Sequence, residues 1–193
     1  MIKRIGLTGG IGSGKTSIAQ ILEAMSYPVY YSDVRAKYLS DEHPDIRAGL
    51  ISLLGADSYI NGTLNRVYVS DCIFSNPDLR LKVNEIIHPI VRKDFDDWSA
   101  QQTSTLIFNE AAILFETGAY QQFDAVLLVC APIDVRIQRV MMRDHCSKAS
   151  VEQRIQSQWT DEQKRSLTDF CVENDGKQPV LKQLEKVLSE LEV

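Results

Sequence analysis

The sequence predicts an α/β fold with a mainly parallel sheet. Short apolar runs alternate with helical patterns along the chain. One apolar run, residues 5–8, leads into a glycine-rich loop and then into an amphipathic helix over residues 16–25. Open α/β sheets bind ligands beyond the carboxyl ends of their strands. The residues that directly follow the expected strands are therefore the first candidates for a functional site.

Five apolar segments are short enough to be buried strands. They are residues 5–8, 29–31, 105–108, 125–130 and 170–172. Near the end of the chain, apolar residues between 180 and 191 repeat at spacings of three and four. That stripe predicts an amphipathic helix packed on the sheet, because it is too short for a coiled coil.

The loop at residues 9–16 fits the pattern G-x-x-x-x-G-K-[ST] between a strand and a helix. Its glycines allow backbone N–H groups to converge on an anion, and the helix N-terminus adds unpaired N–H groups. Lys15 would reach the β- and γ-phosphates, and the Thr16 hydroxyl would ligate Mg²⁺. The strand and helix around the loop disfavour the alternative of a glycine-rich turn with an accidental lysine. The expected nucleotide-binding residues here are Gly10, Ile11, Gly12, Ser13, Gly14, Lys15, Thr16 and Ser17.

Residues 34–100 contain helical patterns and turn signals but no convincing strand. Asn65 is expected to cap a helix that ends near residue 74, and Pro77 to begin another that runs through residue 87. His88-Pro89 would end that helix and begin a further one. Such a segment is too long for an ordinary crossover, so we expect an inserted helical subdomain that covers a second substrate.

A second polar helical stretch follows the fourth strand, at residues 134–167. Within it, residues 160–163 have the form of a capping box and predict a new helix start at Thr160. Arg136, Arg139 and Arg143 are spaced to share one helix face. They could form a lid that neutralises charge on the phosphates, or a solvated face paired with nearby carboxylates. The expected organisation is a single domain with a core at 1–33, 101–133 and 168–193, a substrate subdomain at 34–100 and a lid at 134–167.

Polar residues after the other strands are candidates for chemistry. Asp33 could orient an acceptor hydroxyl, or cap the next helix in competition with Ser32. Glu110 and Glu116 are two candidates for an acidic residue near Mg²⁺, although loop carboxylates are common. Asn174 could contact an adenine edge or belong to a plain turn.

Composition excludes several classes of partner. The formal net charge of −5 argues against a general nucleic-acid or anionic-membrane surface, which would need a basic face. The four cysteines are widely spaced without a C-x-x-C pair, which argues against metal or disulfide roles, and Cys130 is expected to be a core thiol. We expect neither a signal peptide nor a membrane-spanning segment, because the first residues read as a strand and no apolar stretch is long enough to span a bilayer. We expect a cytoplasmic protein, either a monomer or a weak homo-oligomer.

Several segments together resemble the dephospho-coenzyme A kinase family. Besides the phosphate loop and Asp33, they are residues 64–66, 73–74, 87–92 and 113–116, then Gln138-Arg139, Arg143-Asp144, Arg154-Ile155, Gln158 and Asn174. The resemblance covers nearly the whole chain. It implies ATP-dependent phosphorylation of the ribose 3′-hydroxyl of dephospho-coenzyme A, the last step of coenzyme A synthesis.

The resemblance also implies a role for each matching residue. Asp33 would take or orient the acceptor proton, Arg139 and Arg143 would belong to the lid, and Asn174 would lie by the adenine. His88, Arg92 and Glu116 would lie near the acceptor. The chain departs from the family pattern at Ala112, where a proline is usual, at Ile113, where a leucine is usual, and at Arg35, where a second aspartate is common.

Two other functions are compatible with the loop. The first is another small-molecule or nucleoside-monophosphate kinase of the same fold, which would share the insertion and the lid. The second is a nucleotide-dependent switch, although the N-K-x-D motif expected of a GTPase is absent from the sequence.

Overall fold

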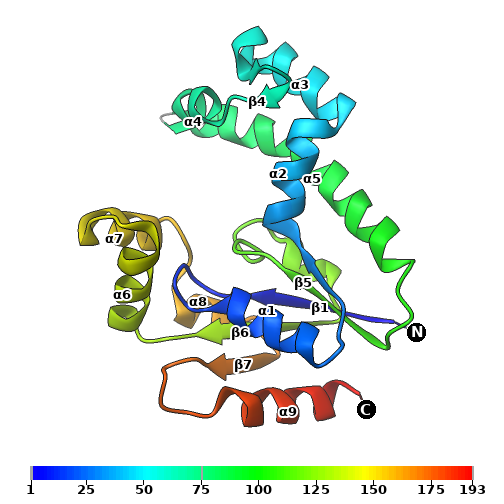
Figure 1. Ribbon diagram of the computed structural model, residues 1–193, viewed down its shortest axis with the longest axis vertical. Helices are drawn as coiled ribbons and strands as arrows, with labels where there is room; N and C mark the ends of the chain where they lie inside the picture. Colours follow the sequence, from blue (N-terminus) through cyan, green and yellow to red (C-terminus); the bar gives the residue numbers. More distant parts are fainter. Residues whose placement is uncertain (1, 75, 193) are drawn as a thin grey trace. The chain divides into compact units, whose positions relative to one another are not determined.

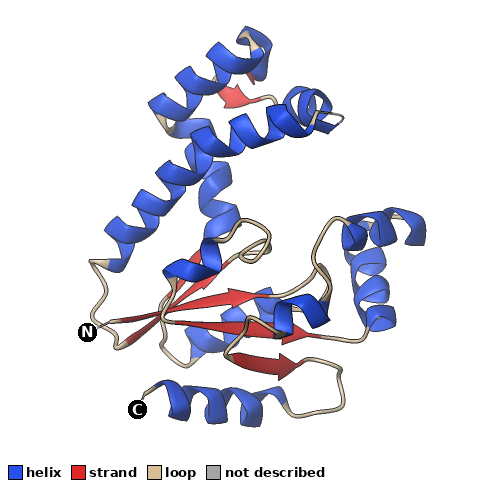
Figure 2. Ribbon diagram, turned by 180° about the vertical axis from the view of Figure 1, so that it is seen from behind, coloured by secondary structure: helices blue, strands red, loops and turns tan. Residues whose placement is uncertain are grey.

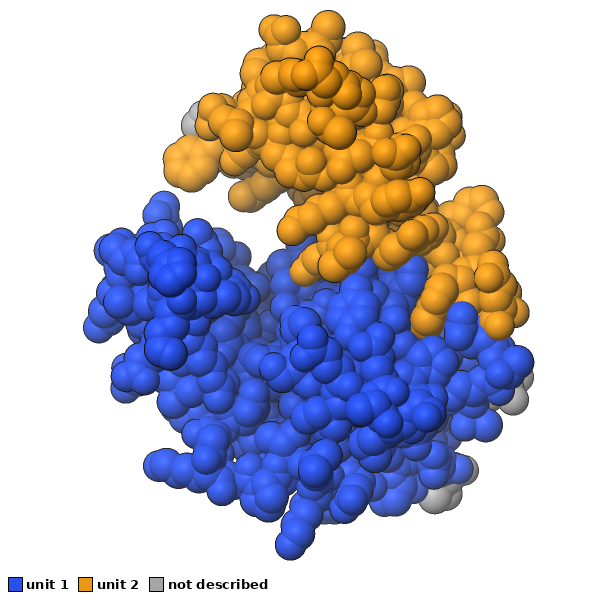
Figure 3. Space-filling model, viewed as in Figure 1, with its two compact units in different colours: residues 1–31, 102–193 blue, residues 32–101 orange. Residues whose placement is uncertain are grey.

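The computed structural model describes residues 2–74 and 76–192 (Figure 1). The chain divides into two compact units, coloured separately in Figure 3. The core unit comprises Met1–Tyr31 and Gln102–Val193, and the helical unit comprises Ser32–Gln101.

The core unit is built on a five-stranded parallel sheet with the order β2-β5-β1-β6-β7 (Figure 2). The strands are β1 (Lys3–Thr8), β2 (Val29–Tyr31), β5 (Leu106–Glu110), β6 (Ala125–Cys130) and β7 (Phe170–Glu173). All five expected strands and the predicted α/β class are confirmed. Since the strands are parallel, their carboxyl ends lie at one edge, where residues 9–16 also begin.

The central strands are buried on both faces. Leu127 and Val129 of β6 join a core cluster with residues of α1 (Lys15–Ala24) and α9 (Val180–Leu191). The alternate residues Val126, Leu128 and Cys130 lie on the opposite face with Phe115. This two-sided burial explains why the strands are continuous apolar runs.

The stretch after β6 forms α6 (Ile133–Asp144), α7 (Lys148–Gln156) and α8 (Asp161–Arg165). Helices α6 and α7 pack as a pair through Ile137, Val140 and Val151 (Figure 1). Partly buried Ile11 of the phosphate loop packs against the same cluster. The expected capping box at Thr160 is present and begins α8.

The helical unit consists mainly of α2 (Ser32–Glu42), α3 (Pro44–Leu54), α4 (Arg66–Phe74) and α5 (Pro77–Ser99), with the short 3₁₀ helix η1 (Ala56–Ser58). Its core contains Leu39, Ile46, Leu50 and Val83. The predicted caps are present, because the Asn65 side chain accepts from the Tyr68 N–H at 3.3 Å and Pro77 opens α5.

Two expectations about this segment are wrong. First, it contains a small antiparallel hairpin, β3 (Tyr59–Ile60) and β4 (Thr63–Leu64), around the Asn61-Gly62 turn. Both turn residues have positive φ, 49° and 86°, as a tight hairpin requires. Two-residue strands are too short to produce a hydrophobic period.

Second, α5 continues through His88-Pro89 instead of ending there. Pro89 cannot donate a backbone hydrogen bond, yet apolar residues before and after it, Ile86, Ile87, Ile90 and Val91, pack on the same core cluster. Tertiary packing therefore outweighs the local penalty. Helix α2 begins at Ser32, directly after β2.

None of the helices in the described part of the chain is both long enough and apolar enough to cross a membrane.

Candidate active site

The loop between β1 and α1 is shaped by glycines at positions that require them. Gly12 and Gly14 have φ angles of 79° and 90°, a region that other residues rarely adopt. Gly14 occupies the N-cap position of α1, and its carbonyl accepts from the N–H groups of Ser17 and Ile18. The N–H groups before Ser17 at the start of α1 have no carbonyl partner within the helix. This arrangement is the one that binds phosphate.

Lys15 and Thr16 meet a carboxylate at the edge of the sheet. Glu110, the last residue of β5, lies 3.2 Å from the Lys15 Nζ through its Oε1 atom, and the same oxygen accepts from the Thr16 hydroxyl at 3.3 Å. Glu110 is buried, whereas Thr16 is exposed. The structure therefore brings together the predicted phosphate lysine, the predicted magnesium ligand and the first of the two candidate acids.

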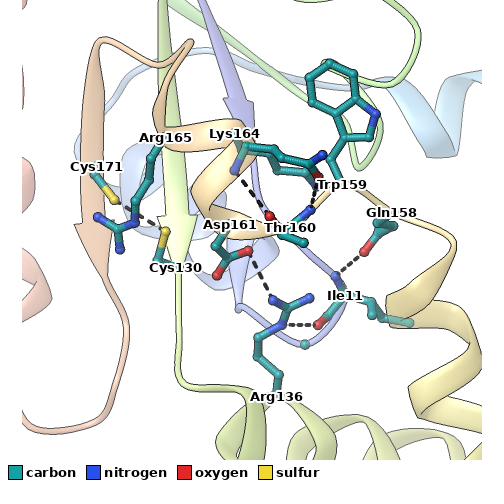
Figure 4. Close-up of polar contacts among 12 residues, drawn as sticks. Ile11, Cys130, Arg136, Gln158, Trp159, Thr160, Asp161, Lys164, Arg165 and Cys171 are labelled. Atoms are coloured by element: carbon teal, nitrogen blue, oxygen red, sulfur yellow. Dashed lines mark hydrogen bonds and ion pairs between the residues drawn. The ribbon is translucent and has the colours of Figure 1, made fainter.

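Arg136 and Gln158 hold the first half of the loop in place (Figure 4). The Arg136 Nε donates to the Ile11 carbonyl at 2.9 Å, and its Nη1 lies 3.1 Å from the Asp161 Oδ1. The Gln158 side chain accepts from the Ile11 N–H at 2.8 Å. Arg136 is only 5% exposed and is therefore part of the loop's support, a role that helical spacing in the sequence did not indicate.

The second half of the loop is held by Arg139 and Asn174. The Asn174 Nδ2 donates to the Ser13 carbonyl at 2.8 Å, and the Arg139 Nη1 donates to the same carbonyl at 3.3 Å. A Cβ at Gly14 would lie 2.2 Å from the Asn174 Nδ2. Asn174 directly follows β7, so it reaches the loop from the same sheet edge.

Arg143 makes its described contacts away from the loop. Its Nε donates to Asp144 at 2.7 Å, and Arg154 of α7 donates to the same carboxylate at 2.7 Å. Hydrogen bonds from Arg143 and Arg154 lower the pKa of Asp144 to about 2. Of the three arginines expected on one face, Arg136 and Arg139 contact the loop, and Arg143 joins α6 to α7 through Asp144.

Glu116, the second candidate acid, lies in a different environment from Glu110. Its Oε1 accepts from the Trp159 N–H at 2.9 Å and lies 3.0 Å from the Nζ of Lys164, which is fully buried. Phe115 stacks on Trp159 at 6.4 Å between ring centroids. Glu116 thus joins the loop after β5 to α8 and to the residue that precedes its N-cap.

The remaining candidates belong to the helical unit. Asp33 is exposed in the first turn of α2, two residues after Tyr31, which is in register with Glu110 on β5. His88 is half-buried in α5, and exposed Arg92 follows one turn later. Burial first, and then the positive charge of Arg92, lower the pKa of His88.

The family profile and the relatives that match this chain all point to one family. The family profile of dephospho-CoA kinase matches residues 3–179. A dephospho-CoA kinase of Bacteroides fragilis is 37% identical over 98% of this chain and 93% of its own length. One from Porphyromonas gingivalis is 47% identical over 80% of this chain and 76% of its own length.

Solved structures agree with the fold. TT1252 from Thermus thermophilus superposes with a TM-score of 0.89 at 32% identity, covering 98% of both chains. A dephospho-CoA kinase from Campylobacter jejuni, at 22% identity, has a TM-score of 0.70 over 99% of this chain and 98% of its own, and supports the fold alone. With a family profile that spans most of its residues, the chain belongs to the dephospho-CoA kinase family.

Proposed function

We propose that the protein transfers the γ-phosphate of ATP to the ribose 3′-hydroxyl of dephospho-coenzyme A, which yields coenzyme A and ADP. The observation that carries this proposal is the cluster of Lys15, Thr16 and Glu110 at the end of a phosphate loop, in a chain that belongs to the dephospho-CoA kinase family. The family match disfavours the alternatives of a nucleoside-monophosphate kinase and a switch.

The donor half of the reaction would use the loop. Residues 10–17 would hold the phosphates through backbone N–H groups other than those of Ile11, Ser13 and Ser17, which already have partners. Lys15 would exchange its contact with Glu110 for the β- and γ-phosphates. This exchange leaves the Glu110 carboxylate beside the Thr16 hydroxyl. A hydroxyl and a carboxylate are oxygen donors of the kind that Mg²⁺ prefers, so we propose that Thr16 would hold the ion with Glu110 beside it. The ion would neutralise phosphate charge.

Arg139 and Arg143 would stabilise the transferring phosphoryl group. Arg139 is already at the loop, 3.3 Å from the Ser13 carbonyl. Arg143 would have to leave Asp144, and this exchange requires a movement of α6 and α7 that we propose as lid closure. Asn174 would lie by the adenine while its amide continues to hold the loop.

The acceptor half would be supplied by the helical unit together with the loop after β5. Asp33 would accept the proton of the 3′-hydroxyl as that oxygen attacks the γ-phosphorus. His88, Arg92 and Glu116 would bind the acceptor, and residues 34–100 would form the coenzyme A subdomain. The core at 1–33, 101–133 and 168–193 and the lid at 134–167 complete the proposed organisation.

The proposal is tested by measuring ATP turnover with dephospho-coenzyme A for the wild type, Asp33→Asn and Lys15→Ala. We expect each variant to lose at least about 100-fold in kcat/KM. Asp33→Asn would remove general-base catalysis, and Lys15→Ala would remove a positive charge that stabilises the transferring phosphoryl group. Asp78→Asn is the matched control for Asp33→Asn, since Asp78 is also an acid in a helical first turn. Lys148→Ala, in exposed α7, is the control for Lys15→Ala.

Three results would overturn the proposal. Full activity in both Asp33→Asn and Lys15→Ala would mean that the site is assigned wrongly. Faster phosphorylation of nucleoside monophosphates than of dephospho-coenzyme A would favour the nucleotide-kinase alternative. ATP hydrolysis that needs no acceptor and is unchanged in Asp33→Asn would favour a switch.

We also propose that the enzyme acts in the cytoplasm as a monomer or weak homo-oligomer. The four free cysteines fit a reducing compartment. Cell fractionation and sedimentation velocity would check these two points.

A further inference from the structure

Two cysteines that are far apart in the sequence lie together in the core unit. The Sγ atoms of Cys130, at the end of β6, and Cys171, in β7, are 3.4 Å apart (Figure 4). Cys130 is in register with Glu173, and Cys171 precedes Glu173 by two residues. Both thiols therefore point to the same face of the sheet. The wide spacing of the cysteines in the sequence did not predict this contact, because it depends on β6 and β7 being neighbours in the sheet.

The pair has a cationic neighbour. Arg165 at the end of α8 forms an ion pair with Glu173, and its guanidinium lies close enough to interact with both sulfurs. The hydrogen bond from Cys130, together with the positive charge of Arg165, lowers the pKa of the Cys171 thiol. The hydrogen bond with Cys171, and then burial, raise the pKa of the Cys130 thiol. Cys171, which is part-exposed, is thus the better nucleophile of the two.

A cavity reaches Cys130, while Cys171 does not line it but is itself partly exposed. Cys130 lines a cavity of about 700 Å³ that is bounded by α6, the end of α7, and α8. Arg165, Glu173 and Trp159 contribute to the same wall. The cavity is large enough to admit a flexible, anionic thiol compound, and Arg165 offers it a positive charge.

Cys130, Cys171 and Glu173 could also be considered as metal ligands, since their donor atoms lie within 4.8 Å of one another. The position of Arg165 argues against a cation. Its guanidinium forms an ion pair with Glu173, so one Glu173 oxygen is already in use, and it places a positive charge beside the sulfurs. A charge of that sign repels a metal ion but stabilises a thiolate.

We propose that Cys130 and Cys171 form a reactive dithiol that low-molecular-weight disulfides convert into an intramolecular disulfide. The Cys171 thiolate attacks one sulfur of the small disulfide, whose S–S bond breaks and releases one thiol. The Cys130 sulfur, after losing its proton, then attacks Cys171 and displaces the second thiol. The protein loses two electrons and two protons, and the small disulfide gains them as two thiols.

The disulfide would affect the nucleotide loop through Asn174. The Asn174 N–H donates to the Cys130 carbonyl at 2.7 Å, and its side chain donates to the Ser13 carbonyl. Drawing the two sulfurs from 3.4 Å to a bond of about 2.05 Å shifts β6 and β7 directly before this residue. We therefore expect oxidation to weaken ATP binding. Disulfide formation itself does not depend on the proposed kinase activity.

The experiment treats the reduced protein with oxidised glutathione and analyses it by mass spectrometry. We expect the wild type to lose two hydrogen atoms and to yield a peptide cross-linked between Cys130 and Cys171. The double variant Cys72→Ser/Cys146→Ser should behave in the same way. It leaves Cys130 and Cys171 unchanged, so this part of the test does not depend on a substitution in the core. Cys130→Ser should stop at a glutathione adduct on Cys171, and Arg165→Gln should react severalfold more slowly.

ATP affinity is measured by calorimetry on the same samples. Oxidised wild type should bind ATP at least severalfold more weakly than reduced wild type, and dithiothreitol should restore the affinity. Adducts confined to Cys72 or Cys146 would overturn the dithiol, and a cross-link without any change in ATP affinity would overturn its coupling to the loop. Stoichiometric Zn²⁺ binding that disappears in Cys171→Ser would identify a metal site instead.

Discussion

At the scale of single residues, a comparison of Gly14 with Gly118 distinguishes two reasons for a glycine, a left-handed backbone and close packing. Both have left-handed backbones, with φ angles of 90° and 69°. A Cβ added to Gly14 would lie 2.2 Å from the Asn174 Nδ2, whereas one added to Gly118 would find no atom within 4 Å. The phosphate-loop glycine is therefore needed both for its φ angle and for the approach of Asn174.

We expect Gly118→Ala to lose about 1–2 kcal/mol of stability, because an alanine is strained in the left-handed region. Gly14→Ala should lose more, because its Cβ also pushes Asn174 away from the Ser13 carbonyl. Gly14→Ala should in addition weaken ATP binding by at least about tenfold, since it displaces Asn174 from the loop. Urea denaturation and calorimetric titration with ATP measure the two effects. Equal ATP affinity in the two variants would contradict the packing role of Gly14.

The charge of Glu110 should matter for the use of Mg²⁺. Glu110→Gln preserves the shape of the side chain but removes the charge that faces Lys15 and Thr16. We expect turnover to fall by about 10- to 100-fold and the Mg²⁺ concentration for half-maximal rate to rise, as is typical when a partner of a bound ion is lost. Steady-state kinetics at varied Mg²⁺ measure both. Glu152→Gln, on exposed α7, is the control, and an unchanged Mg²⁺ requirement in Glu110→Gln would count against the assignment.

At the scale of elements, the sequence predicted those helices and strands whose formation depends on neighbouring residues. Strand β6 is a continuous apolar run, and the Thr160 capping box is a contiguous signal, so both were predicted. The continuity of α5 through Pro89 was not, because packing on the core cluster decides it. Neither the Arg136 contact with Ile11 nor the approach of Cys130 to Cys171 has a local signature, since 125 and 41 residues separate the partners.

The contact between α8 and the loop after β5 depends on a buried ion pair. Lys164 is fully buried beside Glu116, whose Oε2 has no hydrogen-bond partner among the described residues. Lys164→Met should therefore lower the free energy of unfolding by about 3–5 kcal/mol, because it leaves the largely buried Glu116 carboxylate without its cationic partner. Chemical denaturation provides the measurement. The double variant Lys164→Met/Glu116→Gln should recover most of the loss, and a double variant no more stable than Lys164→Met would refute this explanation.

The contact between α6 and α7 should depend on pH. Asp144 has a pKa of about 2 in the folded protein, below the ordinary 3.8, because Arg143 and Arg154 donate to it. A lowered pKa stabilises the fold above the ordinary value, and this stabilisation disappears as the pH falls through about 2. The stability difference between wild type and Asp144→Asn should thus shrink from about pH 5 to about pH 2. Arg154→Gln should reduce this pH dependence, and a constant difference would contradict it.

At the scale of the whole molecule, one chain supplies two units whose boundaries follow the sheet. The helical unit begins directly after β2 and ends shortly before β5, which are neighbours in the sheet. An insertion between adjacent strands leaves the hydrogen bonding of the sheet intact. The phosphate loop, Glu110 and Asn174 all belong to the core unit, whereas Asp33, His88 and Arg92 belong to the helical unit. Donor and acceptor residues are thus divided between the two units.

This division predicts different protection patterns for the two substrates in hydrogen exchange. A non-hydrolysable ATP analogue should slow exchange in residues 9–18, 136–140 and 172–175, where the loop and its supports lie. At about 100 times its dissociation constant it should stabilise the core unit by about 2.7 kcal/mol. Dephospho-coenzyme A should instead slow exchange in residues 32–42 and 83–95, around Asp33, His88 and Arg92.

Lys15→Ala and Arg92→Ala provide the matched controls for this measurement. Lys15→Ala should remove the protection by the ATP analogue and keep that by dephospho-coenzyme A, because the lysine contacts phosphate and belongs to the core unit. Arg92→Ala should do the reverse. If dephospho-coenzyme A protected the phosphate loop and left residues 32–101 unchanged, the acceptor would bind in the core unit, and the proposed role of the helical insertion would have to be abandoned.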